Sequence, residues 1–275
     1  MKRFVATIAY DGSGYFGFQR QPEPIATVQR TLELAIARVT GQQVSVLAAG
    51  RTDTGVHALG QTIAFDAHWK HAECDLLRAI NAELPMDIAA QDLWRQDGFH
   101  PRFDALWRQY VYRLATPTAR NPLLNGRVWQ LVGQAVDLGA LQQAASICLG
   151  ERDFAAFGSA PQEGSRNTIR ALYRSTWGVE EHDQGRIYVY RVRATAFLYH
   201  MVRRMVGTMV QVGIGKINLA EFEEILLSRD IQRAKLLAPA MGLTLEAVGY
   251  PSRMAQAAIS RQSRERATAA ELECT

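Results

Sequence analysis

The order of strand-like and helix-like segments in the first 95 residues limits most strongly how this chain can fold. Alternating apolar residues predict strands over residues 3–10, 44–49, 61–65 and 88–95. Thr27 can cap a helix that runs to Val39 and stops at Gly41, and a second helix is predicted over residues 74–83, before Pro85. The resulting order is β-α-β-β-α-β.

A second and less regular copy of this order follows. Strands are predicted over residues 110–115, 172–179, 186–197 and 243–248, and helices over 137–149 and 201–212. Asn218 and Glu221 have the spacing of a capping box for one more helix, which runs through Leu227. The sequence therefore predicts an α+β fold of two split βαβ, or ferredoxin-like, halves with antiparallel or mixed sheets. We place them at residues 1–105 and 106–250, and expect residues 251–275 to form a loosely ordered tail.

Composition limits the compartment and the partners. The net charge of +4 permits a polyanionic partner without requiring one. The three cysteines, Cys74, Cys148 and Cys274, are far apart and read as free thiols in a reducing compartment. Asp11 interrupts the first apolar stretch too early for a signal peptide, and no apolar run is long enough to span a bilayer. We expect a cytoplasmic protein with no membrane contact.

A single carboxylate marks the candidate site. Asp53 follows the apolar residues 44–49 and lies two residues after Arg51 and two before Gly55, which places it on a tight loop leaving a strand. A nearby guanidinium is expected to favour the ionised carboxylate, which a nucleophile or a general base requires. The alternative is an ordinary turn aspartate beside a surface arginine.

Two further segments carry groups suited to RNA. On the predicted strand around Tyr110, the side chains of Arg108, Tyr110 and Tyr112 share one face and offer flat rings beside a cation for bases and phosphates. A half-buried pair of tyrosine rings in a sheet is the alternative. Arg203 lies near the start of a predicted helix, where the dipole disfavours a cation, so it needs a partner such as Asp53 or else a solvated position.

The remaining polar groups give weaker indications. A methionine at every fourth position of the predicted helix over residues 201–212 indicates a buried stripe. His57 and His200 have no further ligand at metal spacing, so we expect no metal. Other arginines could form a phosphate-binding surface or simply a solvated face: Arg166, Arg170, Arg174, Arg191 and Arg193.

Five segments together resemble the TruA family of tRNA pseudouridine synthases, and their order and spacing match over residues 3–250. They are Tyr15-Phe16-Gly17-Phe18-Gln19-Arg20-Gln21, Gly50-Arg51-Thr52-Asp53-Thr54-Gly55-Val56-His57, Arg108-Gln109-Tyr110-Val111-Tyr112, His200-Met201-Val202-Arg203 with Gly207, and Ala238-Pro239-Ala240-Met241-Gly242-Leu243. The resemblance implies isomerisation of uridine to pseudouridine at positions 38, 39 and 40 of the tRNA anticodon stem-loop. It also implies a homodimer without cofactor or metal, a tRNA held across both subunits, and two ferredoxin-like halves that meet at a central RNA-binding cleft.

The same resemblance assigns roles to four residues. It makes Asp53 the catalytic aspartate and Tyr110 the ring that packs on the target base and is a candidate acceptor of its C5 proton. It makes Arg51 the arginine linked to base flipping and Arg203 the partner of the catalytic aspartate. Four positions depart from residues that are common in the family: Phe18 (often Trp), Thr54 (commonly Ala), Tyr199 (often His) and Arg204 (often Asn).

Two other functions would use some of the same residues. Asp53-Thr54-Gly55 is also the tripeptide of aspartic proteases, but those enzymes need two carboxylates that share a proton, and the chain has one such tripeptide. A non-catalytic RNA-binding module would use the basic and aromatic segments but would give no reason for Asp53. The sequence therefore favours the enzyme.

Overall fold

The computed structural model describes residues 1–160, 167–182 and 185–251, and the predicted tail lies almost wholly outside them. The helices are α1 (Val28–Thr40), α2 (Glu73–Glu83), α3 (Leu138–Ile147), α4 (Met201–Gly213) and α5 (Leu219–Ser228), with 3₁₀ turns η1 (Gly12–Gly14), η2 (Pro122–Leu124) and η3 (Ala240–Gly242). The strands are β1 (Lys2–Tyr10), β2 (Leu47–Ala48), β3 (His57–Ala67), β4 (Ile88–Arg95), β5 (Trp107–Ala115), β6 (Trp129–Gln130), β7 (Gly150–Asp153), β8 (Ile169–His182), β9 (Gly185–Ala194) and β10 (Leu243–Gly249).

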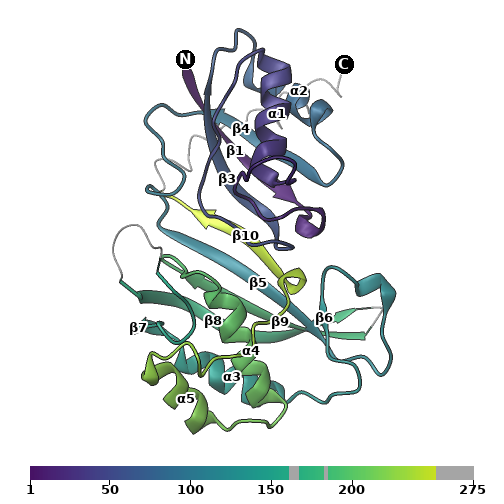
Figure 1. The fold of residues 1–275 in the computed structure, drawn as a ribbon, viewed down its shortest axis with the longest axis vertical. Coiled ribbons are helices and arrows are strands. Elements are labelled where there is room, and N and C mark those ends of the chain that lie inside the picture. The colour runs from purple at the N-terminus through teal and green to yellow at the C-terminus, as the bar shows by residue number, and fades with distance from the viewer. Residues whose placement is uncertain (161–166, 183–184, 252–275) are drawn as a thin grey trace, which may run out of the picture.

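Each half repeats one strand order, as the sequence predicted. In the first half β4, β1 and β3 pair in turn and β2 pairs with β3, while the second half runs β10-β5-β9-β8. Both halves thus place their strands in the order fourth, first, third, second. Helices α1 and α2 lie against the first half, and α3, α4 and α5 against the second (Figure 1). The predicted α+β class is confirmed.

The two half-sheets join edge to edge into one 10-stranded sheet. Strand β10 pairs antiparallel with β5 and also parallel with β3, where Thr244 lies opposite His57 and Leu245 opposite Ala58. Figure 1 shows β10, in yellow, crossing the middle of the molecule beside β5. The division near residue 105 stays a prediction, because the sheet itself is continuous across it.

Local capping sets the helix ends where the sequence placed them. The Thr27 hydroxyl accepts from the Arg30 amide, and Gly41 closes α1 in the left-handed conformation at φ 70°. Asp137 caps α3, and the capping box of Asn218 and Glu221 opens α5. These caps confirm three predicted helix starts.

Several strand predictions were wrong in extent: β5 begins at Trp107 rather than Tyr110, β8 extends beyond residues 172–179 at both ends, and three further strands differ as follows. The strand expected over residues 44–49 pairs only at Leu47–Ala48, because the Val46 amide donates to the Glu33 carboxylate on α1 rather than to a strand. The strand expected over 61–65 begins already at His57, because β1 and β10 pair along both of its edges. The strand expected over 186–197 ends at Ala194, and the chain then turns towards α4.

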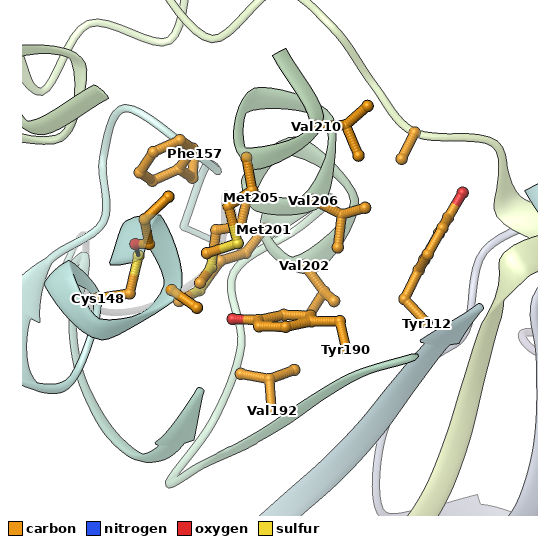
Figure 2. Close-up of a cluster of buried hydrophobic side chains, with 14 of the residues drawn as sticks. Tyr112, Cys148, Phe157, Tyr190, Val192, Met201, Val202, Met205, Val206 and Val210 are labelled. Carbon is orange, nitrogen blue, oxygen red and sulfur yellow. Dashed lines mark hydrogen bonds between the residues drawn. The ribbon is translucent and has the colours of Figure 1, made fainter. Parts of the chain in front are cut away.

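The methionine stripe is core, as predicted. Met201, Met205 and Met209 are at most 1% exposed, and Figure 2 shows the first two on α4 among neighbouring valines and rings. Burying each such side chain contributes about 1.5–3 kcal/mol, so α4 is held firmly against the sheet. Its first turn is therefore a rigid platform for polar groups.

Candidate active site

The loop that carries Asp53 connects β2 to β3 and is held by its neighbours on both sides. The hydroxyls of Tyr10 and Thr52 lie 2.7 Å apart, and the Phe18 amide donates to the Thr52 carbonyl over 3.0 Å. Gly17 has φ +89°, and a Cβ there would lie 3.0 Å from the Thr52 carbonyl oxygen. The loop backbone is thereby fixed directly beside Asp53.

The Asp53 carboxylate faces the start of α4. Its Oδ2 lies 3.1 Å from a terminal guanidinium nitrogen of Arg203 and 3.4 Å from Nε2 of His200. Arg203 also donates from Nε to the Ala238 carbonyl over 2.8 Å, which fixes the guanidinium plane. The structure thus brings together the acid and the arginine that the sequence suggested as partners.

His200 was not foreseen as a contact of the acid. It occupies the N-cap of α4 with φ 62° and makes no side-chain cap, a conformation that non-glycine residues adopt rarely. Burial lowers the pKa of its imidazole below 6.5, with Asp53 opposing this shift and Arg203 and Arg204 adding to it. The imidazole is therefore neutral at neutral pH, and no sequence pattern signals its backbone conformation.

Tyr110 lies on β5 with its side chain half-buried. Its ring meets that of Phe197 edge-on, with 5.1 Å between the centroids. Burial raises the pKa of the Tyr110 hydroxyl, and the charges of Tyr10 and Asp53 raise it further. The phenol is consequently protonated at neutral pH and lies within electrostatic reach of the Asp53 carboxylate.

Arg51 is exposed, and its side chain makes no hydrogen bond or ion pair with any residue in the described ranges. Arg51 precedes Asp53 by two positions, so it projects from the same loop. A long cationic side chain that is not engaged in the fold remains available for a phosphate or for the space left by a base.

Arg108 has a different role from the stacking one suggested by the sequence. Its guanidinium donates to four backbone carbonyls, those of Ala49, Thr195, Arg102 and Ala105, over 2.7–3.4 Å. Burial lowers the pKa of this guanidinium. Arg108 therefore joins the start of the Asp53 loop to the connection that leads into α4. Carbonyl partners leave no mark in a sequence.

The other predicted arginines do not gather around Asp53. Arg191 pairs with Glu180, while Arg193 donates to Gln109 and lies 4.2 Å over the Trp107 ring. Both alternate with the core residues of β9 and so face away from the helices. A phosphate-binding surface there stays a prediction, and Arg166 lies outside the described residues.

His57 is a structural residue. Its Nδ1 accepts from the Gly12 amide, and its Nε2 lies 3.1 Å from the Met241 carbonyl, so it links β3 to η1 and η3. Within the described ranges, no three His, Cys, Asp or Glu side chains are grouped so that they could hold a metal ion. In the same part of the chain no helix has the length and apolar character needed to cross a bilayer.

A hollow of about 620 Å³ lies beside β3 and β10. Its lining includes Asp11, His57, Met86, Arg113 and Arg127, and Asp53 is not part of it. The hollow is thus separate from the acid, and the predicted central RNA-binding cleft stays a prediction.

Comparison with known proteins gives the class of this fold and site. A family model described as "tRNA pseudouridine synthase" matches residues 6–104 and 144–251, which include Asp53, His200 and Arg203. Tyr110 and Arg108 lie between the two matched segments. The chain belongs to the tRNA pseudouridine synthase family, whose members are isomerases that convert uridine to pseudouridine.

Individual relatives narrow the class to one type of synthase. A protein of Paraburkholderia xenovorans named "tRNA pseudouridine synthase A" is 40% identical over 259 residues, covering 93% of this chain and 92% of that protein. Proteins of the same name from Bordetella petrii and Chloroflexus aurantiacus are 41% and 39% identical and cover 91% of this chain and 92% and 90% of their own lengths. The resemblance drawn from the motifs is confirmed.

Proposed function

We propose that the chain isomerises uridine to pseudouridine at positions 38, 39 and 40 of the tRNA anticodon stem-loop, with Asp53 as its catalytic residue and without cofactor or metal. The observation that supports this most is the half-buried Asp53 carboxylate, held by Arg203 and His200 within electrostatic reach of the Tyr110 hydroxyl. Family membership gives the reaction class, and the geometry around Asp53 supports its choice as the catalytic residue.

The reaction rearranges one base on its ribose. The bond between C1′ and N1 breaks, the uracil turns, C1′ bonds to C5, and the C5 proton is lost while N1 gains one. Asp53 can serve by attacking the ribose or the uracil, or by accepting the proton. The contacts to Arg203 and His200 aim the carboxylate in each of these cases.

The substrate base must leave its stack to reach Asp53, which costs a few kcal/mol. Stacking on the Tyr110 ring returns about 1–3 kcal/mol, and Arg51 can occupy the space that the base leaves or hold the backbone. Because burial raises the pKa of Tyr110, its hydroxyl is protonated at rest, which supports the stacking role over that of C5 base. Arg203 serves as the partner that positions Asp53.

Two further features belong to this proposal. We expect a homodimer that holds tRNA across both subunits, and light scattering should then give twice the chain mass of 30.6 kDa. We also expect a cytoplasmic location, in keeping with the tRNA substrate and with the free thiols of Cys74 and Cys148.

The test is Asp53→Asn, which keeps the shape of the side chain and removes its charge. We expect no pseudouridine at positions 38, 39 and 40 and unchanged tRNA binding, measured by mapping pseudouridine in tRNA incubated with the protein. Asp75→Asn is the matched control, because Asp75 is also paired with an arginine, Arg78 at 2.7 Å, but lies on the exposed surface of α2. Substantial activity of Asp53→Asn, or pseudouridine at other positions only, would contradict the proposal.

A further inference from the structure

We propose that Tyr199 binds a second nucleobase of the substrate, the neighbour of the target uridine, on the outer face of its ring. The Tyr199 side chain is 60% exposed. Its ring stacks on the imidazole of His200 with 3.7 Å between centroids and an interplanar angle of 26°. This inference rests on the proposed function and adds a subsite to it.

The subsite lies next to the acid. His200 Nε2 is 3.4 Å from Asp53 Oδ2, so the carboxylate, the imidazole and the Tyr199 ring follow one another in that order. One face of the Tyr199 ring is covered by His200, and the other is open. A base placed on the open face would continue the stack one ring further from Asp53.

The backbone that carries this ring is held in place before any substrate arrives. The Tyr199 amide donates to the Ser159 carbonyl over 3.1 Å. A Cβ at Gly158 would lie 2.7 Å from both Leu198 Cβ and the Tyr199 carbonyl oxygen, so the two segments are in direct contact. With the left-handed His200 after it, Tyr199 lies in a fixed corner, and little conformational entropy is lost on binding.

The chemistry of the reaction explains why a nucleobase is the fitting occupant. When the target uridine turns out of its stack, its neighbours lose the surface on which they were stacked. An exposed aromatic ring replaces that surface for any base, because every base has a π-face.

Tyr110 and Tyr199 would then serve different bases. The Tyr110 ring is half-buried beside Phe197, and its hydroxyl lies within electrostatic reach of Asp53, as the target base requires. The Tyr199 ring stands outside, where an unreacted neighbour can reach it.

The first experiment compares variants on an anticodon stem-loop substrate. Tyr199→Ala should lower kcat/KM roughly 5- to 140-fold, the range that loss of one base–aromatic stack gives, while Tyr199→Phe should keep it. The matched control is Tyr173→Ala, because Tyr173 on β8 is 59% exposed and two strands away from β5, which carries Tyr110. Unchanged kcat/KM for Tyr199→Ala, or an equal loss for Tyr173→Ala, would overturn the proposal.

The second experiment identifies the partner base. Stem-loops that lack the base on the 5′ or the 3′ side of the target uridine are tested with wild type and with Tyr199→Ala. For one of these two substrates, the missing base should lower the kcat/KM of the wild type as much as Tyr199→Ala lowers it on the intact stem-loop. Tyr199→Ala tested on that same substrate should then have a kcat/KM only slightly below either single change. If, on both substrates, the loss of kcat/KM from the missing base and the loss from Tyr199→Ala simply multiply, the proposal is overturned. Absence of pseudouridine from the wild type on the intact stem-loop would instead refute the proposed function.

Discussion

The two halves of the molecule share a strand order but contribute different parts of the site. In the first half, the connection between the second and third strands is the loop that carries Asp53. In the second half, the equivalent strands β8 and β9 pair along nearly their whole lengths, and the groups that face the acid come instead from the start of α4. One half thus supplies the carboxylate and the other supplies the groups that hold it.

The difference between the halves begins at β2. This strand has only two residues, so most of the outer edge of β3 is left without it, and β10 pairs with β3 at His57 and Ala58. The same shortening gives the chain the long segment from Ala49 to Val56 on which Asp53 lies. The shortened β2 in one half of a duplicated fold therefore provides both the joint between the halves and the loop that carries Asp53.

Arg203→Ala should show most strongly that the site is divided between the halves. We expect activity to fall about a hundredfold, because the carboxylate loses the group that aims it. The matched control is Arg204→Ala, since Arg204 is the next residue in the same turn but donates to the Ala234 carbonyl. Single-turnover rates on tRNA measure both, and equal rates for the two variants would mean that the second half does not position the acid.

Arg108→Met should loosen both halves together. The loss of a buried guanidinium leaves carbonyls such as those of Ala49 and Thr195 without a donor, which costs about 1–3 kcal/mol of unfolding free energy. We also expect a fall in kcat with little change in tRNA affinity. Arg3→Met is the control, because Arg3 bonds Asp66 and the Phe99 carbonyl away from the site. Urea titrations measure the unfolding free energy of both variants, and kcat should fall only in Arg108→Met. An equal loss of kcat in Arg3→Met would refute the positioning role of Arg108.

The joint between the halves can be tested with two glycines. A Cβ at Gly60 on β3 would lie 2.5 Å from the Glu246 carbonyl oxygen on β10, so Gly60→Ala should destabilise the protein by about 1–3 kcal/mol. A Cβ at Gly178 on β8 would meet no atom within 4 Å, so Gly178→Ala should be neutral or slightly stabilising. Thermal melting compares the two variants. Similar melting temperatures would show that β3 and β10 can move apart without loss of stability.

The smallest effect concerns pH and His200. Its folded pKa is lowered, mainly by burial, so the folded state favours the neutral imidazole. That contribution to stability is present above pH 6.5 and is lost as the pH falls through the folded value. His200→Asn, which tolerates the left-handed backbone, should weaken this acid sensitivity. Melting curves at neutral pH and at about pH 5.5 would show it, and an unchanged sensitivity would contradict it.

Much of the fold could be predicted because its signals are local. The cap at Thr27, the stop at Gly41 and the alternation over residues 88–95 each depend on a few neighbouring side chains, and each element lies where it was expected. The length of β3 could not be predicted, because it depends on pairing with β10, almost 190 residues later in the chain. Long-range pairing has no local signature.

The site shows the same division. The position of Asp53 on its loop and its contact with Arg203 were accessible, because an arginine at a helix start needs an anion. The contact with His200 was not, because it depends on a left-handed backbone that no sequence signal requires. The four-carbonyl role of Arg108 was likewise hidden, since any residue can present a carbonyl.

The central place of β10 also has a consequence for how the protein is made. Its residues, Leu243–Gly249, are among the last of the described chain to leave the ribosome, yet they fill the middle of the sheet. The first half can collapse around its own helices during synthesis, but until β10 emerges the two halves lack the strand that joins them. A nascent chain halted before Leu243 should therefore contain the proposed catalytic acid, Asp53, without being an enzyme.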